Sequence, residues 1–235
     1  MRKNYLKNNI YRKRFYFPYL NITILIIISN ILFFIIGTLI ISANEGNIKY
    51  IALKPSDIMQ GKYLWTFLTS MFMHGGLFHL FVNMFVLFSL GIFCENIIGR
   101  KRFLWFYLIS GLVAGITFVI LSVSFGNSPI GNKIFGSPGI SGVGASGAIF
   151  AIAGLFMVLT PNLKFSIIFF PFFSLPAYIM IPLVLFATWL VSTGTGLPIG
   201  NTAHFGGFLS GAIYGLYLRK KYSKKVKMLN RIISR

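Results

Sequence analysis

The sequence predicts an all-α, polytopic membrane protein built as a bundle of six membrane-spanning helices. The chain has 235 residues, of which 56% are apolar and only 3 are acidic, a balance that soluble domains do not show. Apolar stretches long enough to cross ~30 Å of hydrocarbon recur along it. The basic residues gather at both ends of the chain, which is typical of cytoplasmic flanks of membrane helices.

Length and apolarity place the six spans near residues 22–42, 76–95, 103–124, 144–160, 170–192 and 199–218. The first run, Ile22 to Ile41, is longer than the core of a signal peptide and precedes a poor cleavage site, so we expect it to be retained. The preceding residues are rich in Lys, Asn and Tyr, which disfavours a mitochondrial presequence.

The remaining spans are delimited by polar or glycine-rich segments. Arg100, Lys101 and Arg102 separate the second span from the third, and a Gly-, Ser- and Pro-rich loop at 125–143 leads into the fourth. The fifth span holds three prolines, which membrane helices tolerate when neighbours satisfy the freed carbonyls. Its Pro- and Phe-rich sequence makes it our candidate for a loosely packed gate.

Charge predicts the topology. With both termini in the cytoplasm, the inner regions collect 18 Lys and Arg residues and the outer loops only 4. We therefore expect a multi-pass protein of the cell membrane with a basic N-terminal segment (1–19), a six-helix domain (20–218) and a basic tail (219–235). The tails would attract anionic lipid headgroups. Nucleic-acid binding is disfavoured, because the charges flank spans instead of forming a folded basic face.

Ser146 is the first residue with chemical potential. It lies in Gly144-Ala145-Ser146-Gly147, where the glycines allow close backbone approach and the N–H groups of a first helical turn lack intrahelical partners. Most membrane serines only bond back to a carbonyl or join helices, so this string alone is weak. Its place just below the outer surface still makes Ser146 a candidate nucleophile.

His204 is the candidate base. A histidine in a membrane helix is costly and is by default a functional-site hypothesis, although it can also fix helix packing. Small residues at 203, 207, 211 and 215 make a smooth ridge against which the start of the fourth span can pack. That packing would bring His204 toward Ser146, where a neutral imidazole could take the hydroxyl proton.

An orienting carboxylate is missing from this arrangement. Glu45 and Asp57 lie in the first loop, and Glu95 lies roughly 24 Å along its helix from His79. A hydrolase here must therefore use a Ser–His dyad, and the same scarcity of acids excludes paired-carboxylate chemistry. The single cysteine, Cys94, can form neither an internal disulfide nor a thiolate metal cluster, and we interpret it as a small buried residue.

His79 and Asn83 share one face of the second span, being four residues apart. Burying both without partners would cost several kcal/mol, so they must meet each other, another helix or a ligand. Aimed at a developing oxyanion, such donors stabilise a transition state; as a structural pair they would only bridge helices. A zinc site is disfavoured, since His74 and His79 have no acidic third ligand.

Together these motifs, in order on spans two, four and six, resemble the rhomboid family of intramembrane serine proteases over residues 18–218. The resemblance implies Ser146 as nucleophile, His204 as general base, and His79, Asn83 and the Ser146 N–H as the oxyanion site. It also implies transmembrane protein substrates cut near the outer face, often beside small residues, with no cofactor, metal or nucleotide.

The chain departs from the family pattern at two positions. Many members have Trp-Arg in the first loop, where this chain has Trp65-Thr66, and many have Tyr four residues after the nucleophile, where it has Phe150. Glu95 has a family counterpart, and we expect it to bond to Asn21 or Thr23. His74 is expected to cap the loop before the second span.

The leading function is an intramembrane endopeptidase. The alternative is a non-catalytic rhomboid-like factor that binds membrane proteins, which predicts loss of the Ser or His that this chain retains. A channel or transporter would need acids or repeated broken helices along a pathway, and the sequence has no such pattern.

Overall fold

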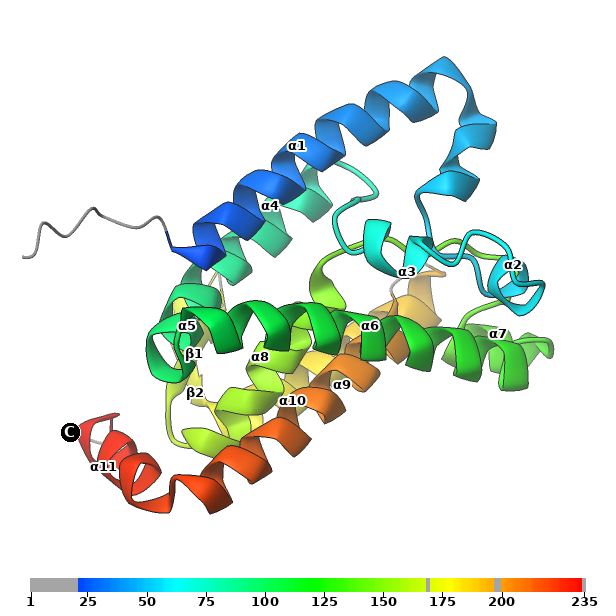
Figure 1. Cartoon of the computed structure of the whole chain (residues 1–235). Coiled ribbons are helices and arrows are strands. Elements are labelled where there is room, and N and C mark those ends of the chain that lie inside the picture. Colours follow the sequence, from blue (N-terminus) through cyan, green and yellow to red (C-terminus); the bar gives the residue numbers. More distant parts are fainter. Residues whose placement is uncertain (1–20, 168–169, 197–199, 234–235) are drawn as a thin grey trace, which may run out of the picture.

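The computed structural model describes residues 21–167, 170–196 and 200–233 (Figure 1). The predicted segment 1–19 and the last two residues of the predicted tail lie outside this part of the chain. Helices dominate the described residues, and the prediction of a helical, polytopic bundle is confirmed.

The first three predicted spans are helices. The first is α1 (Ile22–Ala43) and the third is α6 (Arg100–Phe125). The second is a continuous rod that consists of α4 (Leu77–Val86), the π-turn η2 (Leu87–Gly91) and α5 (Ile92–Ile98). The π-turn lies where α1 approaches this rod: a Cβ on Gly91 would come within 2.7 Å of Thr23 Cγ2. A glycine is therefore needed for α1 to pack here.

Glu95 ties the start of α1 to α5, as predicted for Thr23. Its carboxylate accepts hydrogen bonds from the Ile22 N–H at 2.9 Å and from the Thr23 N–H and hydroxyl at 2.9 and 2.8 Å. The first N–H groups of a helix have no intrahelical acceptor, so this carboxylate caps α1 from another helix. Arg100 lies 3.7 Å from the same carboxylate.

The fourth and sixth predicted spans, α8 (Ser146–Leu159) and α10 (Asn201–Lys221), pack on each other through glycine. A Cβ on Gly207 would collide with the carbonyl oxygen of Gly147, and one on Gly211 with that of Ala151. The two backbones are thus in direct contact, as the predicted small-residue ridge requires.

The prediction of a helix over 170–192 is wrong at its start. In this segment β1 (Lys164–Ile167) pairs antiparallel with β2 (Phe170–Pro176), and the helix α9 begins only afterwards (Ala177–Thr195). Pro171 and Pro176 have no N–H for a helical ladder, so the chain stays extended until the second proline. Pro182 lies inside α9 and is tolerated there.

The strands also bear on the expectation that this segment is a loosely packed gate helix. Phe172 and Phe173 are exposed on β2, which follows the C-terminal end of α8, whereas Ser146 stands at its N-terminal end. Phe169 lies outside the described residues. These phenylalanines are therefore not part of a membrane-spanning gate helix.

Four described helical segments are long and apolar enough to cross a membrane: Ile22–Ala43, Leu77–Ile98, Arg100–Phe125 and Ala177–Thr195. The count of six spans is thus approximate. At 14 residues, α8 is about 21 Å long, shorter than the ~30 Å of hydrocarbon in a bilayer. Because ten of its residues are buried, α8 is wrapped by other helices and need not reach both surfaces.

The first loop folds over one end of the bundle, together with α7 (Pro129–Phe135), which the 125–143 loop contains (Figure 1). It holds η1 (Glu45–Tyr50), α2 (Pro55–Met59) and α3 (Thr66–Thr69). Leu53 and Gly142 exchange backbone hydrogen bonds of 3.0 and 2.8 Å, which join the two loops directly. The loop that leads to Ser146 is therefore braced.

The opposite end carries the two paired strands, the α5–α6 turn and the tail helix α11 (Ser223–Ile233) (Figure 1). Asn230 of α11 donates a 2.7 Å hydrogen bond to the carbonyl of Leu159, the last residue of α8. Part of the basic tail is thus a helix that docks beneath α8.

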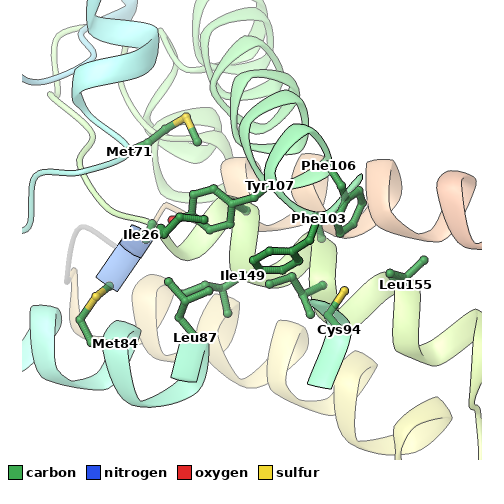
Figure 2. Close-up of a cluster of buried hydrophobic side chains, with 14 of the residues drawn as sticks. Ile26, Met71, Met84, Leu87, Cys94, Phe103, Phe106, Tyr107, Ile149 and Leu155 are labelled. Atoms are coloured by element: carbon green, nitrogen blue, oxygen red, sulfur yellow. The ribbon is translucent and has the colours of Figure 1, made fainter. Parts of the chain in front are cut away.

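The core lies among α1, α4, η2, α6 and α8 (Figure 2). The largest fully buried side chains are aromatic and aliphatic, including Phe103 and Tyr107 of α6, Leu87 of η2 and Phe156 of α8. Cys94 is fully buried in the same cluster, in agreement with its interpretation as a small packing residue.

Candidate active site

Ser146 is the first residue of α8 and is partly buried. Gly144, two residues before it, has a φ of +134°, which side chains rarely adopt, and its N–H donates to the Ser70 carbonyl at 2.8 Å. The chain thus turns sharply into α8 from a braced loop. Ser146 thus stands at the loop-side end of α8.

His204 lies in the first turn of α10, buried at 7% exposure. Its Nε2 is 2.8 Å from the Ser146 hydroxyl oxygen, a good hydrogen-bond distance, although 58 residues separate the two in sequence. The close packing of α8 on α10 produces this contact, since Gly207, one helical turn after His204, lies against Gly147, the residue that follows Ser146.

Phe150 holds the imidazole from its other side. The two rings are stacked with centroids 4.4 Å apart and an angle of 27° between their planes. Phe150 is one helical turn after Ser146, so α8 supplies both the hydroxyl and the ring that orients its partner. The departure from Tyr at this position therefore keeps the ring contact.

The second nitrogen of His204 has no carboxylate partner. Its Nδ1 is buried and makes no hydrogen bond to a described residue, and the same holds for Oδ1 of Asn201, three residues earlier on α10. Glu45 and Asp57 lie in the first loop, and Glu95 caps α1. Our sequence reasoning missed Asn201, whose only signal was its spacing of one turn from His204.

His79 of α4 faces the same turn. A Cβ placed on Gly144 would be 3.0 Å from Cε1 and 3.1 Å from Nε2 of His79, and 3.6 Å from the Ser146 hydroxyl oxygen. The His79 ring and the Ser146 hydroxyl thus approach the same point, and only glycine leaves that space open.

A backbone contact sets the tautomer of His79. The Gly75 N–H donates to its Nδ1 at 3.3 Å, so a neutral ring must carry its proton on Nε2. This nitrogen is the one that faces Gly144 and can donate a hydrogen bond there. The sequence did not reveal Gly75 as an orienting residue.

Asn83 is buried one turn below His79, and its amide donates to the His79 carbonyl at 2.9 Å. One of its two amide hydrogens is used in this way, which leaves the second available. Among the described residues its hydrogen bond is to its own helix and not to Ser146. The structure thus brings Ser146, His204 and His79 together and leaves Asn83 behind them.

His74 is fully buried at the end of the first loop and packs edge-on against His79, with ring centroids 5.1 Å apart. Burial, and then the charge of His79, lower the pKa of His74 to about 4, against an opposing contribution from the Phe72 carbonyl. His74 is therefore neutral at pH 7 and supports the ring of His79, which goes beyond the loop-capping role expected of it.

The first-loop departure is accommodated locally. Thr66 is fully buried, and its hydroxyl donates to the Tyr63 carbonyl at 2.7 Å. Trp65 is exposed and donates from its indole to the Tyr50 carbonyl at 3.0 Å. Thr66 thus braces the loop from within, while Trp65 lies on its outer side.

Metal chemistry has no support in this arrangement. In the described part of the chain, no three His, Cys, Asp or Glu side chains lie close enough together to hold a metal ion. What the site offers is a hydroxyl beside an imidazole, with an imidazole N–H and a free helix N-terminus nearby. These are the groups that acyl transfer to an alcohol requires.

Comparison with known proteins agrees with the resemblance seen in the motifs. RHOMBOID-like protein 4 of Arabidopsis thaliana is 32% identical over 166 residues, which cover 71% of this chain and 37% of the relative. The human presenilin-associated rhomboid-like protein, mitochondrial, is 29% identical over 198 residues, 82% of this chain and 47% of its own length.

Rhomboid protein 1, mitochondrial, of Saccharomyces cerevisiae is 29% identical over 159 residues, 66% of this chain and 42% of the relative. The chain thus spans less than half the length of these relatives. Residues 61–221 match the family model of the Rhomboid domain, and they include every residue of the site described above. With its membrane-spanning helices, the chain is a multi-pass membrane protein that belongs to the rhomboid family.

Proposed function

We propose that this protein is an intramembrane serine endopeptidase that hydrolyses peptide bonds in or near transmembrane segments of other membrane proteins. The observation that carries the proposal is the 2.8 Å contact between His204 Nε2 and the Ser146 hydroxyl at the first residue of α8. Family membership supports it, and a rhomboid-like factor without catalysis would have no need for this pairing.

Ser146 is the nucleophile and His204 the general base in this proposal. As the Ser146 oxygen attacks the scissile carbonyl carbon, its proton moves to His204 Nε2 and the carbonyl oxygen becomes an oxyanion. The imidazolium then returns the proton to the leaving amine, and an acyl-serine ester remains. Water, deprotonated by the same nitrogen, hydrolyses the ester and regenerates Ser146.

The oxyanion is stabilised by groups on two helices. The Ser146 N–H opens α8 and has no intrahelical acceptor, and His79 Nε2–H points at the same turn. Asn83 supplies an amide hydrogen after a side-chain rotation, or else fixes the His79 backbone. Preorganised donors of this kind are worth a few kcal/mol each in the transition state.

The substrates are transmembrane segments that reach Ser146 from the membrane and unwind locally, because a fully hydrogen-bonded helix shields its carbonyls. Both termini face the cytoplasm in our proposal, supported by the excess of Lys and Arg on that side, and anionic headgroups contact the basic tails. The cell membrane is the proposed compartment; cell fractionation that finds the protein in mitochondria would contradict it.

The test is an assay in vesicles that contain this protein and a purified single-pass membrane protein as substrate. The substrate has small residues near its outer membrane boundary, and its cleavage is measured. Wild type should cut it, and Ser146→Ala and His204→Ala should each lower kcat by about 10³-fold or more. Ser89→Ala is the matched control, since this exposed hydroxyl donates to the Phe85 carbonyl of its own helix. Cleavage that survives Ser146→Ala would refute the proposal, and a wild type that does not cut would favour the non-catalytic factor.

A further inference from the structure

A groove outside the active site runs between α6 and α10 at the end of the bundle that carries the tail helix. It encloses about 480 Å³. Its walls are basic at one end and aromatic or aliphatic beyond, and they include Lys101, Arg102, Trp105, Ile109, Ser210 and Tyr214. None of these residues takes part in the proposed reaction.

The mouth of the groove is strongly cationic. Lys101 and Arg102 are exposed in the first turn of α6, where the positive end of the helix makes cations unfavourable. The Arg102 guanidinium lies 5.8 Å from the centre of the Tyr222 ring, and the ammonium groups of Lys221 and Lys225 lie 5.7 and 5.9 Å from the same ring. Three cations thus surround one aromatic side chain.

No side-chain carboxylate can balance these charges. The chain has only three acids. Glu45 and Asp57 belong to the first loop at the opposite end (Figure 1), and Glu95 is buried and already shared between the start of α1 and Arg100. An anion at the groove mouth would relieve the repulsion among the cations and with the helix end.

The body of the groove is apolar. Trp105 and Ile109 follow Lys101 at intervals of four residues on one face of α6, which places Ile109 about 12 Å deeper than Lys101. Trp105 and Ile109 are 63% and 54% exposed, and Tyr214 faces them from α10. A site of this shape suits a molecule with an anionic head and a hydrocarbon tail.

We propose that the groove between α6 and α10 binds one anionic phospholipid, with the phosphate at Lys101 and Arg102 and an acyl chain along Trp105, Ile109 and Tyr214. The proposal goes beyond proteolysis and does not depend on it. It also differs from a general attraction of the basic tails to the membrane, because it assigns the lipid to one groove.

The protein contains its own control for this proposal. A second groove of about 450 Å³, walled by α6, α7, α9 and α10, is lined by Trp189, Leu121, Phe205 and other residues without a charged side chain. The chain has three tryptophans, so Trp65→Phe/Trp189→Phe leaves Trp105 as the only tryptophan and Trp65→Phe/Trp105→Phe leaves Trp189. Each groove can then be read separately.

The experiment measures quenching of each fluorophore in phosphatidylcholine vesicles that contain equal fractions of brominated phosphatidylglycerol or brominated phosphatidylcholine. At Trp105, the association constant of phosphatidylglycerol should exceed that of phosphatidylcholine by at least about fivefold. At Trp189, the ratio of the two constants should be near one. Lys101→Gln/Arg102→Gln should bring the Trp105 ratio toward one. Lys224→Gln/Lys227→Gln removes the same charge from the exposed tail helix and should leave it unchanged.

Native mass spectrometry of protein that keeps all three tryptophans gives a second readout. Phosphatidylglycerol should stay bound to wild type and to the tail variant and be lost from Lys101→Gln/Arg102→Gln. Equal quenching by the two lipids at Trp105, or an equal loss in the tail variant, would overturn the proposal. The proposal would also be overturned if inorganic phosphate displaced more lipid than sodium chloride does at the same ionic strength. A small anion would then be the ligand.

Discussion

Phe150 stacks on the His204 imidazole, with ring centroids 4.4 Å apart. Among the described residues, the other contact that orients this imidazole is the hydrogen bond of its Nε2 with Ser146, because its Nδ1 makes no hydrogen bond. In serine hydrolases with a triad, a carboxylate on Nδ1 does this. Here aromatic packing takes over the orienting part of that role.

Replacing Phe150 therefore tests whether stacking substitutes for a carboxylate. We expect Phe150→Ala to lower kcat by about 10²-fold with a smaller change in KM, because a base displaced by about 1 Å loses that much. Phe150→Tyr should keep most of the activity, since it keeps the ring. Full kcat in the alanine variant would show that the stack does not position His204.

His74 predicts a pH dependence of stability. Its pKa is about 4 in the folded protein and 6.5 ordinarily, so between these values the unfolded chain binds a proton that the folded chain does not. The free energy of unfolding should fall as pH drops through this window. Thermal melts of detergent-purified protein should show a lower Tm at pH 4.5 than at pH 6.5, and His74→Gln should shrink that difference. If the difference in Tm between the two pH values is as large in His74→Gln as in wild type, groups other than His74 cause the loss of stability at low pH.

The sequence pattern singled out Ser146, His204 and His79, which the structure brings together, because each is a polar side chain in an apolar helix beside small residues. It was insufficient for Gly75 and Asn201, whose relevance depends on which atoms face a ring nitrogen. A string of residue types indicates which groups are present. It does not indicate which nitrogen of a histidine accepts and which donates.

The contact between α8 and α10 converts glycine spacing into the geometry of the proposed Ser146–His204 dyad. Because Gly207 lies against the Gly147 carbonyl, any added side chain must push the helices apart and lengthen the 2.8 Å contact between His204 and Ser146. The two functional side chains are adjacent only as long as these backbones touch.

Gly207→Ala should therefore reduce kcat/KM by about 10²-fold and lower stability by about 1–3 kcal/mol through overpacking. Gly194→Ala is the matched control, since its added Cβ meets no atom within 4 Å at the end of α9. Cleavage assays and thermal melts on the two variants measure both effects. If Gly207→Ala behaves as Gly194→Ala does, the helix contact is looser than we describe.

Glu95 links α1 to the rest of the bundle through three accepted hydrogen bonds while only 3% exposed. Glu95→Gln removes the charge that caps α1 and turns one acceptor into a donor facing N–H groups. We expect a loss of about 1.5–3 kcal/mol, measured by denaturation in detergent. An unchanged melting curve would mean that the cap contributes nothing to stability.

The length and apolarity of the runs predicted the helices over 22–42, 76–95 and 103–124 nearly to their ends, because long apolar runs in a bilayer have few alternatives to a helix. They failed at 170–176, where two prolines impose extended backbone within an apolar run. They also could not show that α8 is too short to span the membrane and is enclosed by its neighbours.

The protein as a whole is polarised from end to end. Loops fold over the end at which Ser146 begins α8, and most Lys and Arg side chains of the described residues lie toward the opposite end, beside the groove of about 480 Å³. Catalysis and anchoring in the membrane are thereby proposed for opposite ends of one bundle.

The central claim is that His204 activates Ser146, and covalent labelling tests it most directly. A fluorophosphonate probe reacts with an activated serine, so peptide mapping of labelled, membrane-embedded protein should place the adduct on Ser146. Labelling should disappear in His204→Ala and persist in Ser89→Ala. An adduct on another residue, or equal labelling of Ser146 without His204, would contradict the account.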